Sequence, residues 1–143
     1  CTAIDACDAG ARVALLDADR RLGGSTALSG GVYYAAGTSV QRAIGIADDD
    51  ADAMFDYYMT LNQYRVEPAL ARRLCDEAAP GLEWLIGLGV EFSPDALYRS
   101  GVERVPRGHG ATGNGAAIAA ARESPARPRW LSACPAWRRR STS

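Results

Sequence analysis

The predicted fold depends on two neighbouring stretches near the start of the chain, Arg12-Val-Ala-Leu-Leu-Asp17 and Gly23-Gly-Ser-Thr-Ala-Leu-Ser-Gly-Gly31. The first is a short apolar run that ends in an acidic residue, which is typical of a buried parallel strand. Residues 1–10 precede it and have the pattern of a helix that ends with Gly10 in the left-handed conformation. A helix, a glycine and a buried strand make up the second half of a βαβ unit, so the sequence predicts an α/β fold.

The glycine-rich stretch after the predicted strand holds four glycines and three hydroxyl side chains in nine positions. Small residues let backbone N–H groups and hydroxyls approach a pyrophosphate or a flat ring closely. In a dinucleotide-binding βαβ unit, an acid at the end of the second strand accepts hydrogen bonds from ribose hydroxyls. The alternative interpretations are an ordinary polar strand end and a flexible linker. The candidate nucleotide-binding residues are Asp17, Gly23, Gly24, Ser25, Thr26, Ser29, Gly30 and Gly31.

Two helices are predicted downstream of this region. An acidic cap at residues 48–50 begins the first, and Glu67-Pro68 begins the second, which Pro80-Gly81 is expected to interrupt. Apolar residues at helical spacing define the expected inner faces: Met54, Tyr58 and Leu61 in the first helix, and Leu70, Leu74 and Ala78 in the second. Residues 32–36 and 90–92 are expected to be short extended segments, residues 94–115 a segment rich in loops, and residues 116–122 a helix.

Together, Val13–Asp17 and Leu22–Gly31 resemble the FAD-binding region of flavoproteins related to fumarate reductase, succinate dehydrogenase and 3-ketosteroid Δ1-dehydrogenase. The resemblance extends from residue 1 to about residue 122. It implies a partial Rossmann-like FAD-binding domain over residues 1–45 and the start of a helical substrate-cap domain over residues 46–123. It also implies FAD as the cofactor, with Asp17 on the ribose and the glycine-rich stretch along the pyrophosphate and flavin.

The implied activity is hydride transfer between flavin and a C–C bond that a carbonyl or carboxylate activates. The stretch Arg107-Gly-His-Gly-Ala-Thr-Gly113 is similar to an Arg-x-His-x-x-Thr-Gly segment of soluble fumarate reductases, which implies that His109 and Thr112 bind the substrate. A loop histidine without a role is the alternative. Residues 25–28 are closer to the 3-ketosteroid dehydrogenases, so both a dicarboxylate and a 3-ketosteroid stay open as substrates.

A further glycine pattern resembles a nucleotide-binding motif. Gly108-x-Gly110-x-x-Gly113 matches a dinucleotide fingerprint, but no apolar strand precedes it, so we interpret it as a substrate-side loop.

Two parts of such an enzyme are not found in this sequence: the first strand with its glycine turn, and the catalytic acid or base. We therefore expect a fragment that is inactive by itself and binds FAD weakly. A non-catalytic nucleotide- or phosphate-binding domain is the alternative function.

Composition excludes several other classes. The chain is 48% hydrophobic and 23% charged, which is typical of a folded domain, and no apolar run is long enough to span a bilayer. One histidine and no C-x-x-C pair argue against a structural zinc site. The four cysteines are expected to be free thiols in a reducing cytoplasm.

The last twenty residues differ in composition from the rest of the chain. Residues 124–143 contain five arginines, three prolines and no acidic residue. Three prolines exclude a continuous helix there. Three interpretations are open: a disordered terminus, a basic arm that binds nucleic acid or membrane, and an out-of-frame translation. We expect no nucleic-acid partner, and a small molecule as the substrate.

Overall fold

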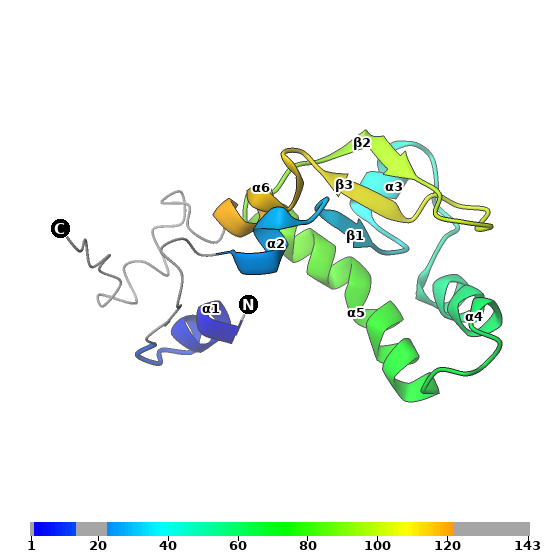
Figure 1. Ribbon diagram of the computed structural model, residues 1–143, viewed down its shortest axis with the longest axis horizontal. Coiled ribbons are helices and arrows are strands. Elements are labelled where there is room, and N and C mark those ends of the chain that lie inside the picture. Colours follow the sequence, from blue (N-terminus) through cyan, green and yellow to red (C-terminus); the bar gives the residue numbers. More distant parts are fainter. Residues whose placement is uncertain (1, 14–22, 122–143) are drawn as a thin grey trace.

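The computed structural model describes residues 2–13 and 23–121 of the chain (Figure 1). Within them six helices and three strands follow one another. The helices are α1 (Thr2–Asp8), α2 (Gly24–Leu28), α3 (Ser39–Ala43), α4 (Ala51–Leu61), α5 (Pro68–Gly87) and α6 (Asn114–Ala121). The strands are β1 (Val32–Tyr34), β2 (Phe92–Tyr98) and β3 (Gly108–Ala111).

The three strands form an antiparallel sheet in the order β1-β3-β2. His109 on the central strand β3 lies opposite Tyr33 on one side and Leu97 on the other. The segment 94–115, predicted to be rich in loops, holds more regular structure than expected: most of β2, all of β3 and the start of α6 fall inside it, and residues 99–107 form the loop between the two strands. Pro94 fits in β2 because this is an edge strand whose pairing shifts register between Phe92 and Leu97. Pairing on both sides compensates the poor strand propensity of the two glycines in β3.

The helix starts agree with their sequence signals. The Asp50 side chain accepts a hydrogen bond of 2.8 Å from the amide of Ala53 at the start of α4. Glu67 caps α5, and Pro68 occupies its first turn. The predicted interruption of α5 is wrong, because the helix continues through the exposed Pro80. Packing of its inner face stabilises the helix more than the missing proline N–H weakens it.

Helix α5 packs through a different face from the predicted one. Leu70 and Leu74 are 70% and 49% exposed, so their assignment to the inner face is wrong. The buried residues of α5 are Ala71, Cys75, Ala78, Leu82 and Leu85. The first three are small, which lets the N-terminal half of α5 approach α4 and the residues after β1 closely. Cys75 is a free thiol, as predicted, and the side chains of the other three cysteines lie outside the described part.

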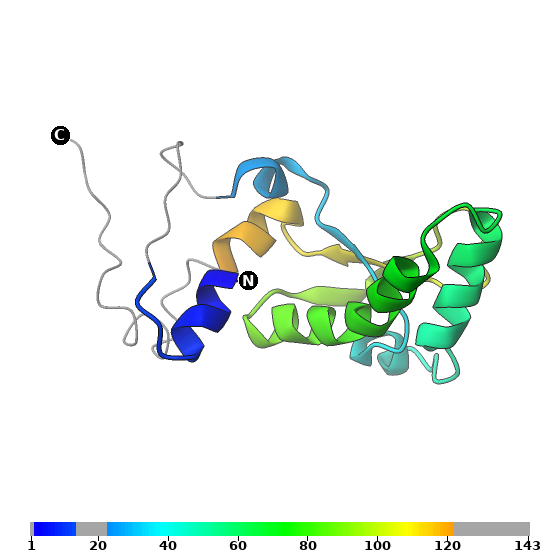
Figure 2. The same cartoon turned by 90° about the horizontal axis from the view of Figure 1, so that it is seen from below.

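The core consists of two clusters that the long helix α5 joins. One contains Ile4 of α1, the C-terminal half of α5, and residues of β2, β3 and α6. The other contains Ala35, Met54 and the N-terminal half of α5. Figures 1 and 2 show α5 running along the sheet, with α4 at one end of the molecule and α2 and α6 together at the other. Both clusters combine residues from before and after position 45, and the two-domain division stays a prediction.

The described part is thus a mixed α/β structure. Its sheet is small and antiparallel, whereas the predicted parallel strand lies mostly within residues 14–22, outside the described residues. The Rossmann-like arrangement and the cap domain stay predictions. The basic segment 124–143 also lies outside the described residues. No helix among the described residues is both long enough and apolar enough to cross a bilayer.

Candidate functional site

One face of the glycine-rich stretch is fixed against the start of α6. Gly31 has φ +67°, and a Cβ on it would overlap the backbone of Asn114 and Gly115. A Cβ on Gly115 would in turn overlap the carbonyl oxygen of Thr26 and the hydroxyl of Ser29. The Gly115 amide donates to the Ser29 carbonyl at 3.1 Å, and the Ala111 amide donates to the Gly31 carbonyl at 3.0 Å. These glycines are therefore required by packing within the chain.

The opposite face of the same stretch is open. Gly24, Ser25, Ser29 and Gly30 are exposed, and Leu28 is 90% exposed. A Cβ on Gly24 or Gly30 would have no atom of the described residues within 4 Å, but Gly24 has φ +47°, which by itself favours glycine. Gly30 has neither a positive φ nor a close neighbour among the described residues. The fold as described does not account for a glycine at position 30, and a ligand in close approach to the backbone would.

The remaining candidates for nucleotide binding are placed as follows. Gly23, with φ +121°, precedes α2, and Thr26 is half-buried within that helix. The Ser29 hydroxyl donates to the Thr26 carbonyl at 2.8 Å and accepts from the Gly31 amide at 3.3 Å. Asp17 lies outside the described residues. Of the predicted glycines and hydroxyls, Gly24, Ser25, Ser29 and Gly30 are therefore exposed on α2 or just after it, whereas Gly31 is buried.

His109 lies in the interior, at 1% exposure. Its Nδ1 faces the carbonyl oxygens of Arg107 at 2.8 Å and Tyr33 at 3.2 Å, so this nitrogen carries the proton and donates. Its Nε2 is then free to accept from the hydroxyl of Thr38, 2.8 Å away. Burial lowers the pKa of His109 below its ordinary value, although the two carbonyls oppose this effect. The structure therefore favours a neutral imidazole that is fully hydrogen bonded by the chain itself.

Thr112 is exposed, in the turn between β3 and α6. Its amide donates to the Glu91 carbonyl at 2.9 Å, and the preceding residue, Ala111, is bonded to Gly31. Thr112 thus lies close to the glycine-rich stretch, whereas His109 points into the core. The match of residues 108–113 to a dinucleotide fingerprint coincides with a strand, β3, and the turn after it.

A buried polar network that the sequence did not predict extends from His109. Thr38 and Gln41 form a capping box at the start of α3, and the Gln41 amide nitrogen Nε2 donates to Asp49 at 2.9 Å and to the Pro106 carbonyl at 3.0 Å. Arg107 donates to both carboxylate oxygens of Asp49, with Nε at 3.0 Å from Oδ2 and Nη2 at 2.5 Å from Oδ1. Burial is the largest influence on Arg107 and lowers its pKa, but the hydrogen bonds and charge of Asp49, together with the charges of Glu103 and Tyr57, outweigh it and raise the pKa above its ordinary value.

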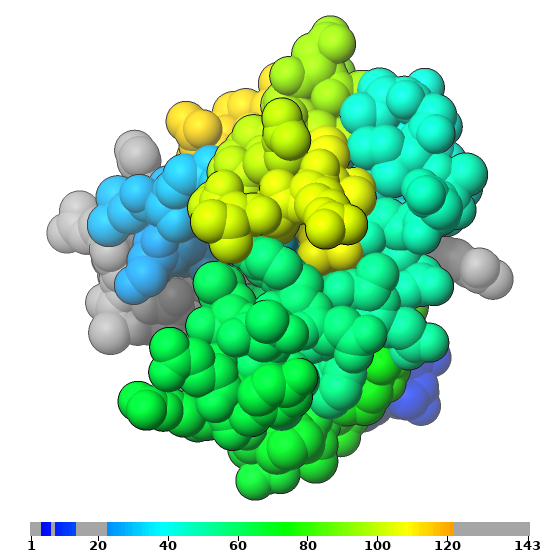
Figure 3. Space-filling model, turned by 90° about the vertical axis from the view of Figure 1, so that its right-hand side faces the viewer, coloured from blue at the N-terminus to red at the C-terminus, as the bar shows by residue number. Residues whose placement is uncertain are grey.

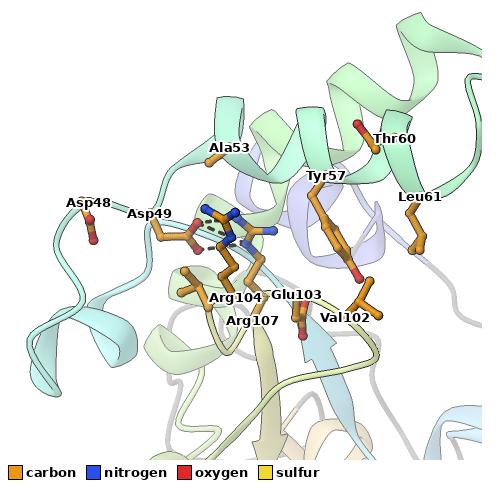
Figure 4. Close-up of a pocket in the computed structure, with 11 residues that line it drawn as sticks. Asp48, Asp49, Ala53, Tyr57, Thr60, Leu61, Val102, Glu103, Arg104 and Arg107 are labelled. Carbon is orange, nitrogen blue, oxygen red and sulfur yellow. Dashed lines mark hydrogen bonds and ion pairs between the residues drawn. The ribbon is translucent and has the colours of Figure 1, made fainter.

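The buried Arg107–Asp49 pair lies at the edge of a pocket of about 410 Å³ between α4 and the loop that joins β2 to β3 (Figures 3 and 4). The pocket has apolar and charged walls. Its lining residues are Asp48, Asp49, Ala53, Tyr57, Thr60, Leu61, Val102, Glu103, Arg104, Val105 and Arg107. These residues are up to 59 positions apart in the sequence, and no local motif marks them. Among the described residues no group of three His, Cys, Asp or Glu side chains could hold a metal ion.

The chain is similar to a known protein family and to several reductases. A family model described as FAD binding domain matches residues 1–143. The chain is 32% identical over 117 residues to a fumarate reductase (cytochrome) of Shewanella frigidimarina, covering 81% of this chain and 20% of that protein. It is 35% identical over 101 residues to the probable fumarate reductase Ifc3 of the same organism, covering 71% and 17%. It is 33% identical over 91 residues to a digoxin reductase of Eggerthella lenta, covering 62% and 16%.

The chain belongs to the FAD binding domain family. FAD is therefore its cofactor, and the relatives that it matches are reductases, which confirms the predicted resemblance to flavoproteins related to fumarate reductase. The chain spans about a fifth of the length of the curated relatives it matches. The likeness to 3-ketosteroid dehydrogenases stays a prediction.

Proposed function

We propose that the exposed face of residues 23–31 lies along FAD and that the parent flavoprotein transfers hydride between flavin and an activated C–C bond. The observation that carries this proposal is Gly30, which has open space beside it and no conformational need to be glycine. FAD would bring a flat ring and a pyrophosphate, both of which pack closely only against small residues. The exposed Leu28 beside it would give the ring an apolar contact.

The residues present fit the roles that FAD requires of them. Ser25 is exposed at the start of α2, where its hydroxyl and backbone amide would face a phosphate group. Gly24 and Gly30 would allow the close approach of the nucleotide, and Asp17 would accept from its ribose. Gly23, Thr26, Ser29 and Gly31 would hold the turn in shape through the contacts described above. Bound FAD would supply the hydride acceptor or donor, and the chain would orient it and exclude water.

For the substrate we propose a dicarboxylate, by similarity to the fumarate reductases that the chain matches. Thr112, exposed next to the glycine-rich surface, would donate a hydrogen bond to a substrate oxygen. A direct contact from His109 would require Thr38 to give up Nε2, because both ring nitrogens are occupied in the structure. A 3-ketosteroid and a location in the cytoplasm are retained as predictions.

The test is FAD binding by the full chain, measured from the change in flavin fluorescence, with Gly30→Ala as the variant. We expect the wild-type chain to bind weakly, and Gly30→Ala to bind about tenfold more weakly or worse while unfolding at the same denaturant concentration. Gly110→Ala is the matched control, because a Cβ there makes ordinary contacts with Ala96 and points toward β2. Equal FAD affinity of the Gly30→Ala and wild-type chains would contradict the proposed surface. Binding of ADP as tight as that of FAD would instead favour a phosphate-binding domain without redox chemistry.

A further inference from the structure

The pocket between α4 and the β2–β3 loop lies away from the proposed FAD surface. Figure 1 places α4 at one end of the sheet and α2, which carries the glycine-rich stretch, at the other. Figure 3 looks at the α4 end, where the yellow loop of residues 99–107 lies against the helix. The Tyr57 hydroxyl is 3.4 Å from the carbonyl oxygen of Ser100 and connects the two walls. The pocket is therefore a second, separate feature of the fold.

Glu103 in this pocket has a carboxylate oxygen that the described residues do not satisfy. The residue is only 5% exposed. Its Oε1 accepts a short hydrogen bond from the amide of Ser100, whereas Oε2 is buried and has no hydrogen-bond partner among the described residues. A buried carboxylate oxygen without a donor is costly, and such groups in folded proteins usually meet a donor from elsewhere. Glu103 lines the pocket, so a bound molecule would supply the missing donor once a small turn of the side chain brings Oε2, which is buried in this structure, to the cavity wall.

The charges around the pocket indicate the sign of that molecule. Arg107 forms a buried ion pair with Asp49, its guanidinium lies 5.5 Å from the centre of the Tyr57 ring, and the charge of Glu103 also raises its pKa. Of the remaining charged residues in the lining, Asp48 and Glu103 are acidic and Arg104 is basic, which leaves one negative charge in excess. The pocket therefore favours a cation. A metal ion is a poor match, because no third ligand side chain joins Asp48 and Glu103 within the described part.

The walls of the pocket indicate the rest of the ligand. Tyr57, Leu61 and Val102 give it an apolar side, and Leu61 and Val102 are 54% and 81% exposed. In Figure 4 the Tyr57 ring and the Leu61 and Val102 side chains gather at one end, and Asp49 lies at the other. A volume of about 410 Å³ is sufficient for a small organic molecule. An apolar body that carries one positive charge fits both parts.

We propose that this pocket binds a small organic ammonium ion. The ammonium group donates a hydrogen bond to Oε2 of Glu103, and the apolar body packs against Tyr57, Leu61 and Val102. The Asp49–Arg107 pair holds the β2–β3 loop against the segment before α4 and so keeps the pocket in shape.

Three probes of nearly equal shape test the proposal on the full chain without FAD: 2-phenylethylamine, 2-phenylethanol and phenylacetate. Calorimetric titration should show the cation binding at least about tenfold more tightly than the neutral alcohol, and the anion binding worst, since a charge-assisted hydrogen bond exceeds a neutral one. Glu103→Gln should remove the preference for the amine over the alcohol. Asp48→Asn removes an exposed charge from the same lining and should weaken the binding of the amine by less than about threefold.

A measurement on the wild-type chain guards against misfolding of the variants. In amide NMR spectra, 2-phenylethylamine should shift resonances of residues 53–61 and 100–107 and leave those of residues 23–31 in place. Failure of the amine to shift these resonances overturns the proposal. Tighter binding of phenylacetate than of the amine, or an unchanged preference in Glu103→Gln, also overturns it. The FAD titration is a separate experiment, so either idea can fail alone.

Discussion

Replacing Asp49 by alanine should be among the most destabilising single changes in the described part of the chain. Arg107 and Asp49 are both buried, and the carboxylate accepts from two guanidinium nitrogens and from Gln41. Removing the carboxylate leaves the guanidinium charge buried without a hydrogen-bonded acidic partner among the described residues, and only the more distant charge of Glu103 still favours it. Breaking one partner of a buried pair costs about 3–5 kcal/mol. That is a large part of the 5–15 kcal/mol that stabilises a typical domain.

The free energy of unfolding should be measured by urea titration followed by far-UV circular dichroism. Asp52→Ala is the control, since Asp52 pairs with Arg72 at 2.7 Å but is almost fully exposed. That exposed pair should contribute less than about 1 kcal/mol.

A double variant separates the energy of the ion pair itself from the cost of leaving one buried charge without its partner. In Asp49→Leu/Arg107→Met the buried charge is gone together with its partner, so the loss should be smaller than the sum of the two single losses. A loss below about 1 kcal/mol for Asp49→Ala would refute the reasoning, and so would strictly additive single losses.

Three more outcomes are expected. His109 is the only histidine, and burial lowers its pKa in the folded state, so the unfolded chain takes up the proton first, near pH 6.5. The contribution of His109 to the free energy of unfolding should be complete above that pH and fall by at most about 1.4 kcal/mol per pH unit below it. Urea titrations at several pH values should find this dependence missing in His109→Gln. Gly31→Ala should lower the free energy of unfolding by about 2–4 kcal/mol, because φ is +67° and the new Cβ would overlap the start of α6. A decrease of less than about 1 kcal/mol would show that the turn can move aside. Leu82→Ala, at a fully buried position, should lower the unfolding free energy by about 2–5 kcal/mol, and Leu74→Ala, half exposed on the same helix, by much less.

Local signals were sufficient to predict α1, α4, α5 and α6, but they predicted neither the short helices α2 and α3 nor the packing of α5. Asp50 and Glu67-Pro68 mark the starts of α4 and α5 because capping depends on neighbouring residues. The buried face of α5 was assigned to Leu70 and Leu74, although Ala71 and Cys75 occupy it. Small residues carry a weak hydropathy signal, yet they are the ones that permit close approach of another element. The tertiary contact therefore decided which side of this helix is buried.

The sheet and the polar network depend on contacts between distant parts of the sequence. Gly108-His-Gly-Ala111 has poor strand propensity, and only pairing with β1 and β2 makes it a strand. Asp49 and Arg107 are 58 positions apart, so neither residue in its own context indicates the other. The glycine-rich stretch could be proposed as a site from the sequence because its residues are adjacent there, and its contact with FAD stays a prediction. The position of His109 in the interior, in contrast, follows from the pairing of β3.

The order β1-β3-β2 has a consequence for the time at which the domain can form. Tyr33 and His109 face each other across 76 positions of chain, and β1 has no other strand beside it within the described residues. During synthesis, the backbone groups of residues 32–34 must stay in water until residues 108–110 have left the ribosome. Closing so long a loop is slow, so the newborn chain exposes Val32 and its neighbours to chaperones and to other copies of itself.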